Sequence, residues 1–118
     1  MFKLNKISKF FTTSNKIIQN TKINIYNGAS FDISKVLDEN CNITSFSNIL
    51  DNTISQWSKD NIRSITVRVE EKYSEYIPLF IKRGFYFHHC RENYLVLCKW
   101  IDTKTKNKLP NYAHHGVG

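Results

Sequence analysis

The sequence contains no run of about 18 consecutive apolar residues, the length that a membrane-spanning helix needs, so no such helix is expected. Cysteine is scarce, since Cys41, Cys90 and Cys98 are the three in the chain and no C-x-x-C pair occurs. A framework of disulfides is therefore not indicated, and a reducing compartment is the simpler interpretation. A disulfide between Cys90 and Cys98 in an oxidising compartment stays open, because the two cysteines could lie on neighbouring strands.

Acidic residues are missing from the first 31 positions, whereas residues 1–22 hold five lysines. In that segment Leu4, Ile7, Phe11 and Ile18 would share one face of a helix, with lysine, serine and threonine around them. A basic amphipathic segment of this kind is typical of mitochondrial targeting sequences. The alternative is that residues 1–22 form an arm that packs on a partner.

The formal net charge of +7 is concentrated in this basic segment. The rest of the chain carries 12 basic and 10 acidic groups, so the body of the protein is close to neutral. Neither a basic stripe nor interleaved stacking aromatics is visible, and specific nucleic-acid binding is not expected. With 118 residues, 41% of them hydrophobic and 14% aromatic, the chain is long enough for one domain with a packed core.

The N-terminal half of the body predicts two strands and a helix. Alternating apolar residues at 23–26 and again at 31–33 flank Asn27-Gly28, which is a strong hairpin turn. Asn42 or Thr44 can then cap a helix. The apolar residues that recur at helical spacing and should face inward are Ile43, Phe46, Leu50, Ile54 and Trp57.

The C-terminal half predicts three strands and a second helix. Residues 62–69 alternate as in a half-covered strand, and residues 85–89 and 94–101 form an antiparallel hairpin. Between them a helix should end at Gly84, which tolerates the left-handed conformation. Pro78 should kink this helix or mark a late start. The residues expected to face inward are Tyr73, Tyr76, Ile77, Phe80 and Ile81.

The predicted fold class is α+β, with a small mixed or antiparallel sheet of about five strands and two helices in the order β-β-α-β-α-β-β. This order resembles part of the acetyltransferase (GNAT) fold. An acetyltransferase binds the pyrophosphate of its cofactor with a Q/R-x-x-G-x-G/A turn at a helix N-terminus. The corresponding residues 70–75 contain no glycine and three glutamates, so we expect no cofactor.

Three blocks in the last third of the chain follow one another in a distinctive order. Residues 84–90 are G-F-Y-F-H-H-C, residues 94–101 are Y-L-V-L-C-K-W-I, and residues 109–118 are L-P-N-Y-A-H-H-G-V-G. Together they resemble the pre-Nudix domain that precedes the catalytic domain in one branch of the Nudix hydrolases. The resemblance implies a GNAT-like domain at 23–101 and a tail at 102–118 that links to a hydrolase domain.

The catalytic signature of Nudix hydrolases, G-x5-E-x7-R-E-U-x-E-E-x-G-U, does not occur in the 118 residues. The nearest carboxylates, Glu70, Glu71 and Glu75, lack the rest of that signature and suit the solvated start of a helix. We therefore expect no catalytic and no metal-binding residues.

The histidines invite an acid–base or metal hypothesis. Adjacent strand residues point to opposite faces, so His88 and His89 should diverge, one packed near the core and the other in solvent. His114 and His115 fall in the segment that the resemblance assigns to a linker. Cys98 lies in an apolar strand and should be a buried, inert thiol.

Our first hypothesis is a non-catalytic structural or interaction subunit of a mitochondrial multiprotein complex, on the matrix side or in an inner-membrane complex, with the respiratory chain favoured over the ribosome. Its partners would be other protein subunits. The residues expected to touch them are Leu4, Ile7, Phe11, Leu109, Pro110 and Tyr112. The alternative is the N-terminal part of a Nudix hydrolase acting on ADP-ribose, NADH or CoA derivatives. A degenerate acyltransferase is a third hypothesis.

Overall fold

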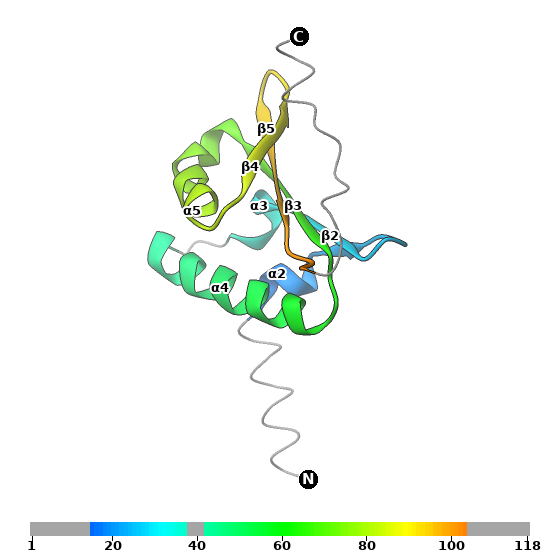
Figure 1. Cartoon of the computed structure of the whole chain (residues 1–118). Coiled ribbons are helices and arrows are strands. Elements are labelled where there is room, and N and C mark those ends of the chain that lie inside the picture. The colour runs from blue at the N-terminus through cyan, green and yellow to red at the C-terminus, as the bar shows by residue number, and fades with distance from the viewer. Residues whose placement is uncertain (1–14, 38–41, 104–118) are drawn as a thin grey trace.

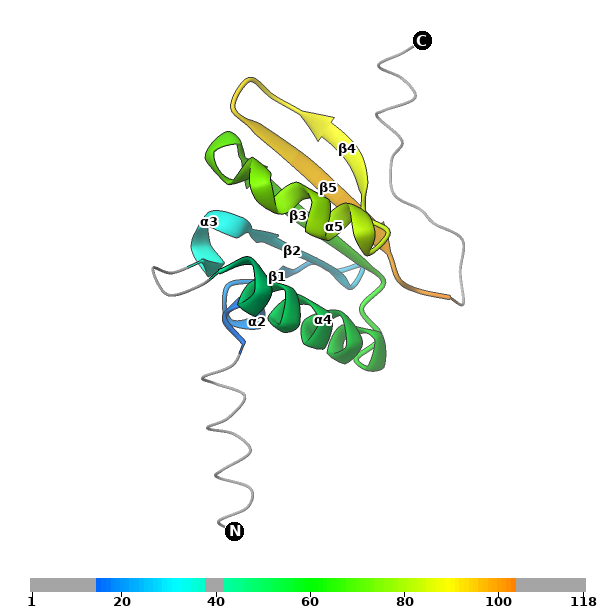
Figure 2. The same ribbon diagram turned by 90° about the vertical axis from the view of Figure 1, so that its left-hand side faces the viewer.

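The structure, a computed structural model, describes residues 15–37 and 42–103. These residues form an α+β domain in which a five-stranded mixed sheet carries α4 and α5 on one face (Figures 1 and 2). The predicted fold class is thus confirmed, as is the predicted order of the main elements. Within the described residues no helix is both long and apolar enough to span a membrane.

The strands are β1 (Lys22–Ile23), β2 (Gly28–Asp32), β3 (Ser64–Glu70), β4 (Tyr86–Cys90) and β5 (Tyr94–Trp100). They are arranged in the order β1-β2-β3-β5-β4. β2 and β3 are parallel, and the other neighbours are antiparallel. The last strand of the sequence, β5, is therefore inserted between β3 and β4. The two longest strands, β3 and β5, are central and are paired on both sides.

The helices are α2 (Lys16–Gln19), α3 (Ile33–Val36), α4 (Ile43–Lys59) and α5 (Ile77–Lys82), and a 3-10 helix, η1 (Glu71–Tyr76), precedes α5. The two helices predicted for the body of the chain are confirmed as α4 and α5. Helix α2 lies within residues 1–22, where an amphipathic helix was expected, but the residue that it buries is Ile17, whereas Ile18, expected on the apolar face, is 39% exposed. The four-residue helix α3 was not predicted, because one helical turn is too short to show a hydrophobic period.

Helix α4 begins where the capping residues indicated. The Asn42 side chain accepts a hydrogen bond from the backbone N–H of Ser45 at 2.8 Å, which satisfies one of the helix's first amide groups. Ile43 is 39% exposed, so its predicted inward position is wrong. It lies in the first turn, where the helix begins beyond the edge of the core. The buried residues of α4 are Phe46, Leu50, Thr53 and Trp57.

Pro78 marks a late start of α5. It lies in the first turn of the helix, where the missing amide hydrogen breaks no intrahelical bond. The residues before it form the tighter η1 instead. Phe80 is fully buried, whereas Ile81 is 40% exposed, contrary to the prediction. Consecutive residues of a helix point about 100° apart, so with Phe80 facing the core Ile81 lies at the side of α5.

The core lies between the sheet and these helices. Ile65, Val67 and Val69 of β3 alternate inward as predicted and are at most 1% exposed. Over them the Phe80 ring makes edge-to-face contacts with Phe46 at 5.9 Å and with Phe85 at 5.1 Å between ring centroids. Such pairs add to the free energy that burial of the rings already provides.

Part of the basic N-terminal segment joins this core. Ile17 of α2 is 1% exposed and belongs to the core cluster. The Asn15 side chain caps α2 by accepting from the Ile18 amide at 3.0 Å, and it also accepts from the buried hydroxyl of Thr53 at 3.1 Å. This second bond ties α2 to α4.

The β1–β2 hairpin is shorter than the alternation indicated. The Asn24 side chain accepts hydrogen bonds from the amides of Tyr26 (2.8 Å) and Gly28 (2.9 Å), so the strand ends at Ile23 and not at Tyr26. Asn27 has φ of 60° in the turn. As a result Ile25 and Tyr26, predicted as strand residues, are 88% and 72% exposed at the tip.

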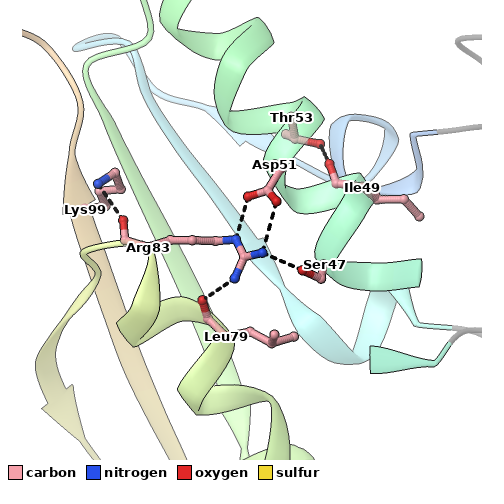
Figure 3. A network of polar contacts seen from close by, with 7 residues as sticks. All are labelled: Ser47, Ile49, Asp51, Thr53, Leu79, Arg83 and Lys99. Carbon is pink, nitrogen blue, oxygen red and sulfur yellow. Dashed lines mark hydrogen bonds and ion pairs between the residues drawn. The ribbon is translucent and has the colours of Figure 1, made fainter. Parts of the chain in front are cut away.

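Arg83 joins α5 to α4 (Figure 3). Its guanidinium donates to both carboxylate oxygens of Asp51, at 2.6 Å from Nε and 3.0 Å from Nη2. It also donates to the Leu79 carbonyl at 2.8 Å and to the Ser47 hydroxyl. This network fixes the end of α5 against the exposed side of α4.

Gly84 ends α5 as predicted, with φ of +88°. We expect Gly84→Ala to lower the free energy of unfolding by about 1–2 kcal/mol, because a side chain is strained in this conformation. The added Cβ would also lie 2.8 Å from Lys99 Nζ, which donates to the Arg83 carbonyl. Urea denaturation of Gly84→Ala and of Gly84→Ala/Lys99→Ala separates the two causes. Equal stability of Gly84→Ala and wild type would contradict the assigned backbone strain.

Candidate functional site

The face of the sheet opposite α4 and α5 carries polar and charged side chains in rows set by the strand register. Lys22, Ser30 and Thr66 are register partners across β1, β2 and β3, and the next row holds Asp32 beside Arg68. Partners across neighbouring strands point to the same face. Residues from three strands therefore meet on one surface.

A hollow of about 630 Å³ lies over these rows. We call it the basic hollow. Three of its lining residues are cationic and one is acidic. The cations come from β1, β3 and α3, and the polar residues come from the sheet and from the segment that joins α2 to β1. The lining residues are Gln19, Asn20, Thr21, Lys22, Ser30, Phe31, Asp32, Lys35, Thr66 and Arg68.

Asp32, the acid of the basic hollow, is committed to two structural roles. Its Oδ1 accepts hydrogen bonds from the amide (3.1 Å) and the hydroxyl (2.8 Å) of Ser34, which caps α3. Its Oδ2 lies 3.8 Å from Nε of Arg68, an ion pair beyond hydrogen-bond distance. The carboxylate thus positions both α3 and Arg68.

Arg68 is held from a second direction by Tyr94 of β5. Its guanidinium carbon lies 3.9 Å from the centre of the Tyr94 ring, in a cation–π contact. The side chain is 47% exposed. Because about half of the side chain is exposed, its N–H groups can still donate hydrogen bonds to an anion.

A second hollow of about 520 Å³ lies near the other end of the sheet. Its charged lining residues, Arg63 and Asp102, form an ion pair at 3.3 Å between Nε and Oδ2. Because these two charges balance, this hollow offers less to a charged ligand than the basic hollow does.

His88 and His89 do not diverge as predicted. An irregularity in the β4–β5 register falls between Phe87 and His89, so His88 is an extra residue in the ladder. Such a bulge breaks the strict alternation of side chains. His88 is buried at 8% exposure, as one of the pair was expected to be, but the two Nδ1 atoms lie 2.8 Å apart. The imidazoles therefore share one hydrogen bond.

The thiols on β4 and β5 are both free. Cys90 is paired in register with Leu95, and Cys98 with Tyr86, so the two cysteines are not opposite each other. Cys98 is buried as predicted, and burial raises the pKa of its thiol, against a weaker opposing effect of the hydrogen bond with Thr66. A thiol with a raised pKa is a poor nucleophile at neutral pH.

The remaining candidate site residues are the three glutamates near the end of β3 and a group of residues outside the described ranges. Glu70 ends β3, and Glu71 and Glu75 lie in η1. In residues 15–37 and 42–103 no cluster of three or more His, Cys, Asp or Glu side chains could hold a metal ion. Of the residues named in the sequence predictions, the following lie outside the described ranges: Leu4, Ile7, Phe11, Cys41, Leu109, Pro110, Tyr112, His114 and His115.

Sequence reasoning missed the basic hollow. Lys22, Lys35 and Arg68 are far apart along the chain and belong to no motif. The polar positions of β3 did indicate that Arg68 would face away from the core. The partners that complete the surface depend on the pairing of β1 and β2 with β3, which the spacing of charges does not reveal.

Comparisons with known proteins identify relatives. The family model described as "Nudix hydrolase domain" matches residues 20–101. Nudix hydrolase 8 of Arabidopsis thaliana is 30% identical over 93 residues, which are 79% of this chain and 24% of that protein. Nudix hydrolase 2 of the same plant is 28% identical over 93 residues, again 79% of this chain and 32% of that protein. The chain thus spans about a quarter to a third of the length of these relatives.

Proposed function

The chain belongs to the Nudix hydrolase family, and from this premise we propose that it is the N-terminal part of a hydrolase of nucleoside-diphosphate-linked compounds. The substrate classes in this proposal are ADP-ribose, NADH and CoA derivatives. The observation that carries it is the partial coverage of the relatives. The matched segment is 79% of this chain, yet it is only 24% and 32% of the length of the two relatives, which are named as hydrolases.

The first hypothesis, a non-catalytic structural or interaction subunit of a mitochondrial multiprotein complex, is wrong on these findings. The family match covers residues 20–101, and the similar proteins are named as hydrolases, not as components of an assembly. The hypothesis rested on the missing catalytic signature. A missing signature in one part of a longer enzyme needs no separate function to explain it.

In the proposed enzyme this part supplies a folded domain and leaves the hydrolysis to another part. The signature whose paired glutamates hold divalent cations does not occur in the 118 residues. The domain has its own core between the sheet and the helices α4 and α5. Such a core is what a domain needs to fold as a unit within a longer chain.

The reading frame tests this proposal directly. We expect the transcript to continue in frame beyond Gly118 into the signature G-x5-E-x7-R-E-U-x-E-E-x-G-U. The longer product should hydrolyse ADP-ribose, NADH or a CoA derivative with Mg²⁺, as measured by release of adenosine monophosphate, or of adenosine 3′,5′-bisphosphate in the case of a CoA derivative. The 118-residue chain should show no turnover, because it lacks the paired glutamates that hold the metal.

Two controls make the result specific. Replacing a signature glutamate of the longer product by glutamine should abolish turnover without changing the melting temperature of the N-terminal domain. A stop codon directly after Gly118 in the native transcript would remove the proposal. Turnover by the isolated 118-residue chain would also contradict it, because the chemistry would then belong to residues outside the signature.

A further inference from the structure

We propose that the basic hollow is a binding site for a small phosphate-bearing anion, with a diphosphate as the best-fitting class. This site is separate from the hydrolytic chemistry and does not depend on the proposed function. The hollow is about 630 Å³, within the range of small-ligand pockets, and its lining holds three cations and one acid. An exposed excess of positive charge in a concave site attracts anions.

The spread of the cations favours a ligand with more than one anionic group. Lys22 lies on β1 and Arg68 on β3, with β2 between them. Two strand spacings separate the outer strands by roughly 10 Å. Lys35 approaches from α3, at the end of β2. A single carboxylate cannot contact cations on all three elements at once, whereas the two phosphoryl groups of a diphosphate can be shared among them.

Arg68 is the residue best prepared to recognise phosphate. A guanidinium can donate two parallel hydrogen bonds to a phosphoryl group. The Tyr94 ring at 3.9 Å and the Asp32 carboxylate at 3.8 Å already restrict its orientation. Less conformational freedom is then lost when a ligand binds, which favours affinity.

The floor of the hollow adds neutral donors. Ser30 and Thr66 lie in the same row of the sheet as Lys22, and Asn20 lies at the edge formed by the α2–β1 connection. Hydroxyl and amide groups can donate to phosphate oxygens without adding net charge. Glu70, the next residue of β3 on this face, is not part of the lining.

Asp32 gives the proposal its sharpest test, because its negative charge opposes an anion. Asparagine at this position keeps an oxygen that can cap α3 but removes the charge. We expect Asp32→Asn to bind diphosphate about twofold to fivefold more tightly, because removal of the negative charge outweighs the loss of the weak ion pair with Arg68, which the Tyr94 ring still restrains. Asp60→Asn, at the end of α4, makes the same change in net charge outside the hollow and should leave binding unchanged.

The measurement is isothermal titration calorimetry of the full 118-residue chain with sodium pyrophosphate, at low salt and without magnesium. For wild type we expect a Kd of about 1 mM or below, since the contacting cations are solvent-exposed. Lys35→Gln should weaken binding about twofold to fivefold, and Arg68→Gln about tenfold because two hydrogen bonds are lost. Lys59→Gln is the matched control, since Lys59, like Lys35, lies in the last turn of a helix.

Three outcomes would overturn the site. The first is no binding of pyrophosphate by wild type, and the second is an equal loss of affinity for Lys35→Gln and Lys59→Gln. The third is that wild type binds a hexaglutamate peptide as tightly as pyrophosphate, which would indicate attraction to net charge or to an acidic protein segment. Circular dichroism melts of each variant check that the domain remains folded. Because the readout is binding to the isolated chain, its failure leaves the reading-frame test of the proposed function untouched.

Discussion

Phe80→Ala is expected to lower the free energy of unfolding by about 3–5 kcal/mol, the largest single effect anticipated for this domain. The Phe80 side chain is fully buried and contacts the rings of Phe46 and Phe85 edge to face. Truncation removes the buried ring and leaves a cavity that the short α5 and the sheet cannot close. A domain of this size is stable by about 5–15 kcal/mol, so the loss is a large fraction of its total free energy of unfolding.

The neighbouring residue supplies a matched control. Ile81 lies on the same helix but is 40% exposed. Ile81→Ala should change stability by less than about 1 kcal/mol, because little buried surface is lost and alanine favours the helix. Guanidinium denaturation followed by tryptophan fluorescence measures both variants. Similar losses for Phe80→Ala and Ile81→Ala would show that α5 does not pack as described.

Arg83→Ala is expected to destabilise the domain by about 2–3 kcal/mol. The guanidinium contacts Asp51 through two hydrogen bonds, and Ser47 and the Leu79 carbonyl through others (Figure 3). Its side chain is 18% exposed, so water replaces these bonds only in part. Arg83→Lys keeps the charge but loses the fork geometry and should recover less than half of the loss.

The same pair should make stability depend on pH at the acidic end. Hydrogen bonding from Arg83 lowers the pKa of Asp51, and partial burial opposes this while the charge of Arg83 adds to it. Because the folded-state pKa is depressed, the contribution is complete above the ordinary carboxyl pKa of about 4 and is lost as the pH falls through the folded value. Asp51 is 56% exposed, so the effect is small in free energy.

Asp51→Asn provides the test of that assignment. Asparagine accepts one hydrogen bond from Arg83 but cannot carry the charge, so the variant should lose part of the acid dependence between about pH 5 and pH 2. Melting temperatures of wild type and variant across this range show the difference. Parallel curves for the two proteins would assign the acid sensitivity to other carboxylates.

Several parts of the fold could be predicted from the sequence because their signals are local. The 3.6-residue period of α4, its Asn42 cap and the alternation of β3 each depend on neighbouring residues. Gly84 ends α5 because glycine readily adopts the positive φ that follows the last turn of a helix. Local rules failed where a local competitor was overlooked, as at Asn24, whose side chain captures two amides and shortens β1.

The candidate site shows the opposite case. The alternation of β3 predicted that Arg68 would face away from the core. Nothing near Arg68 in the sequence indicated that Lys22 or Lys35 would lie beside it. Similarly, alternation predicted that His88 and His89 would separate, and one extra residue in the β4–β5 ladder brought their Nδ1 atoms to 2.8 Å. Register is a property of two strands together and cannot be obtained from either strand alone.

The sequence by itself determined the family resemblance, the absence of the hydrolytic signature from these 118 residues and the alternation that fills the core. Only the tertiary structure decided that three distant cations surround one hollow and that a single arginine joins α4 to α5. The physical reason is range. Hydrophobic period and capping act within a few residues, whereas charges meet wherever strand pairing and helix packing place them.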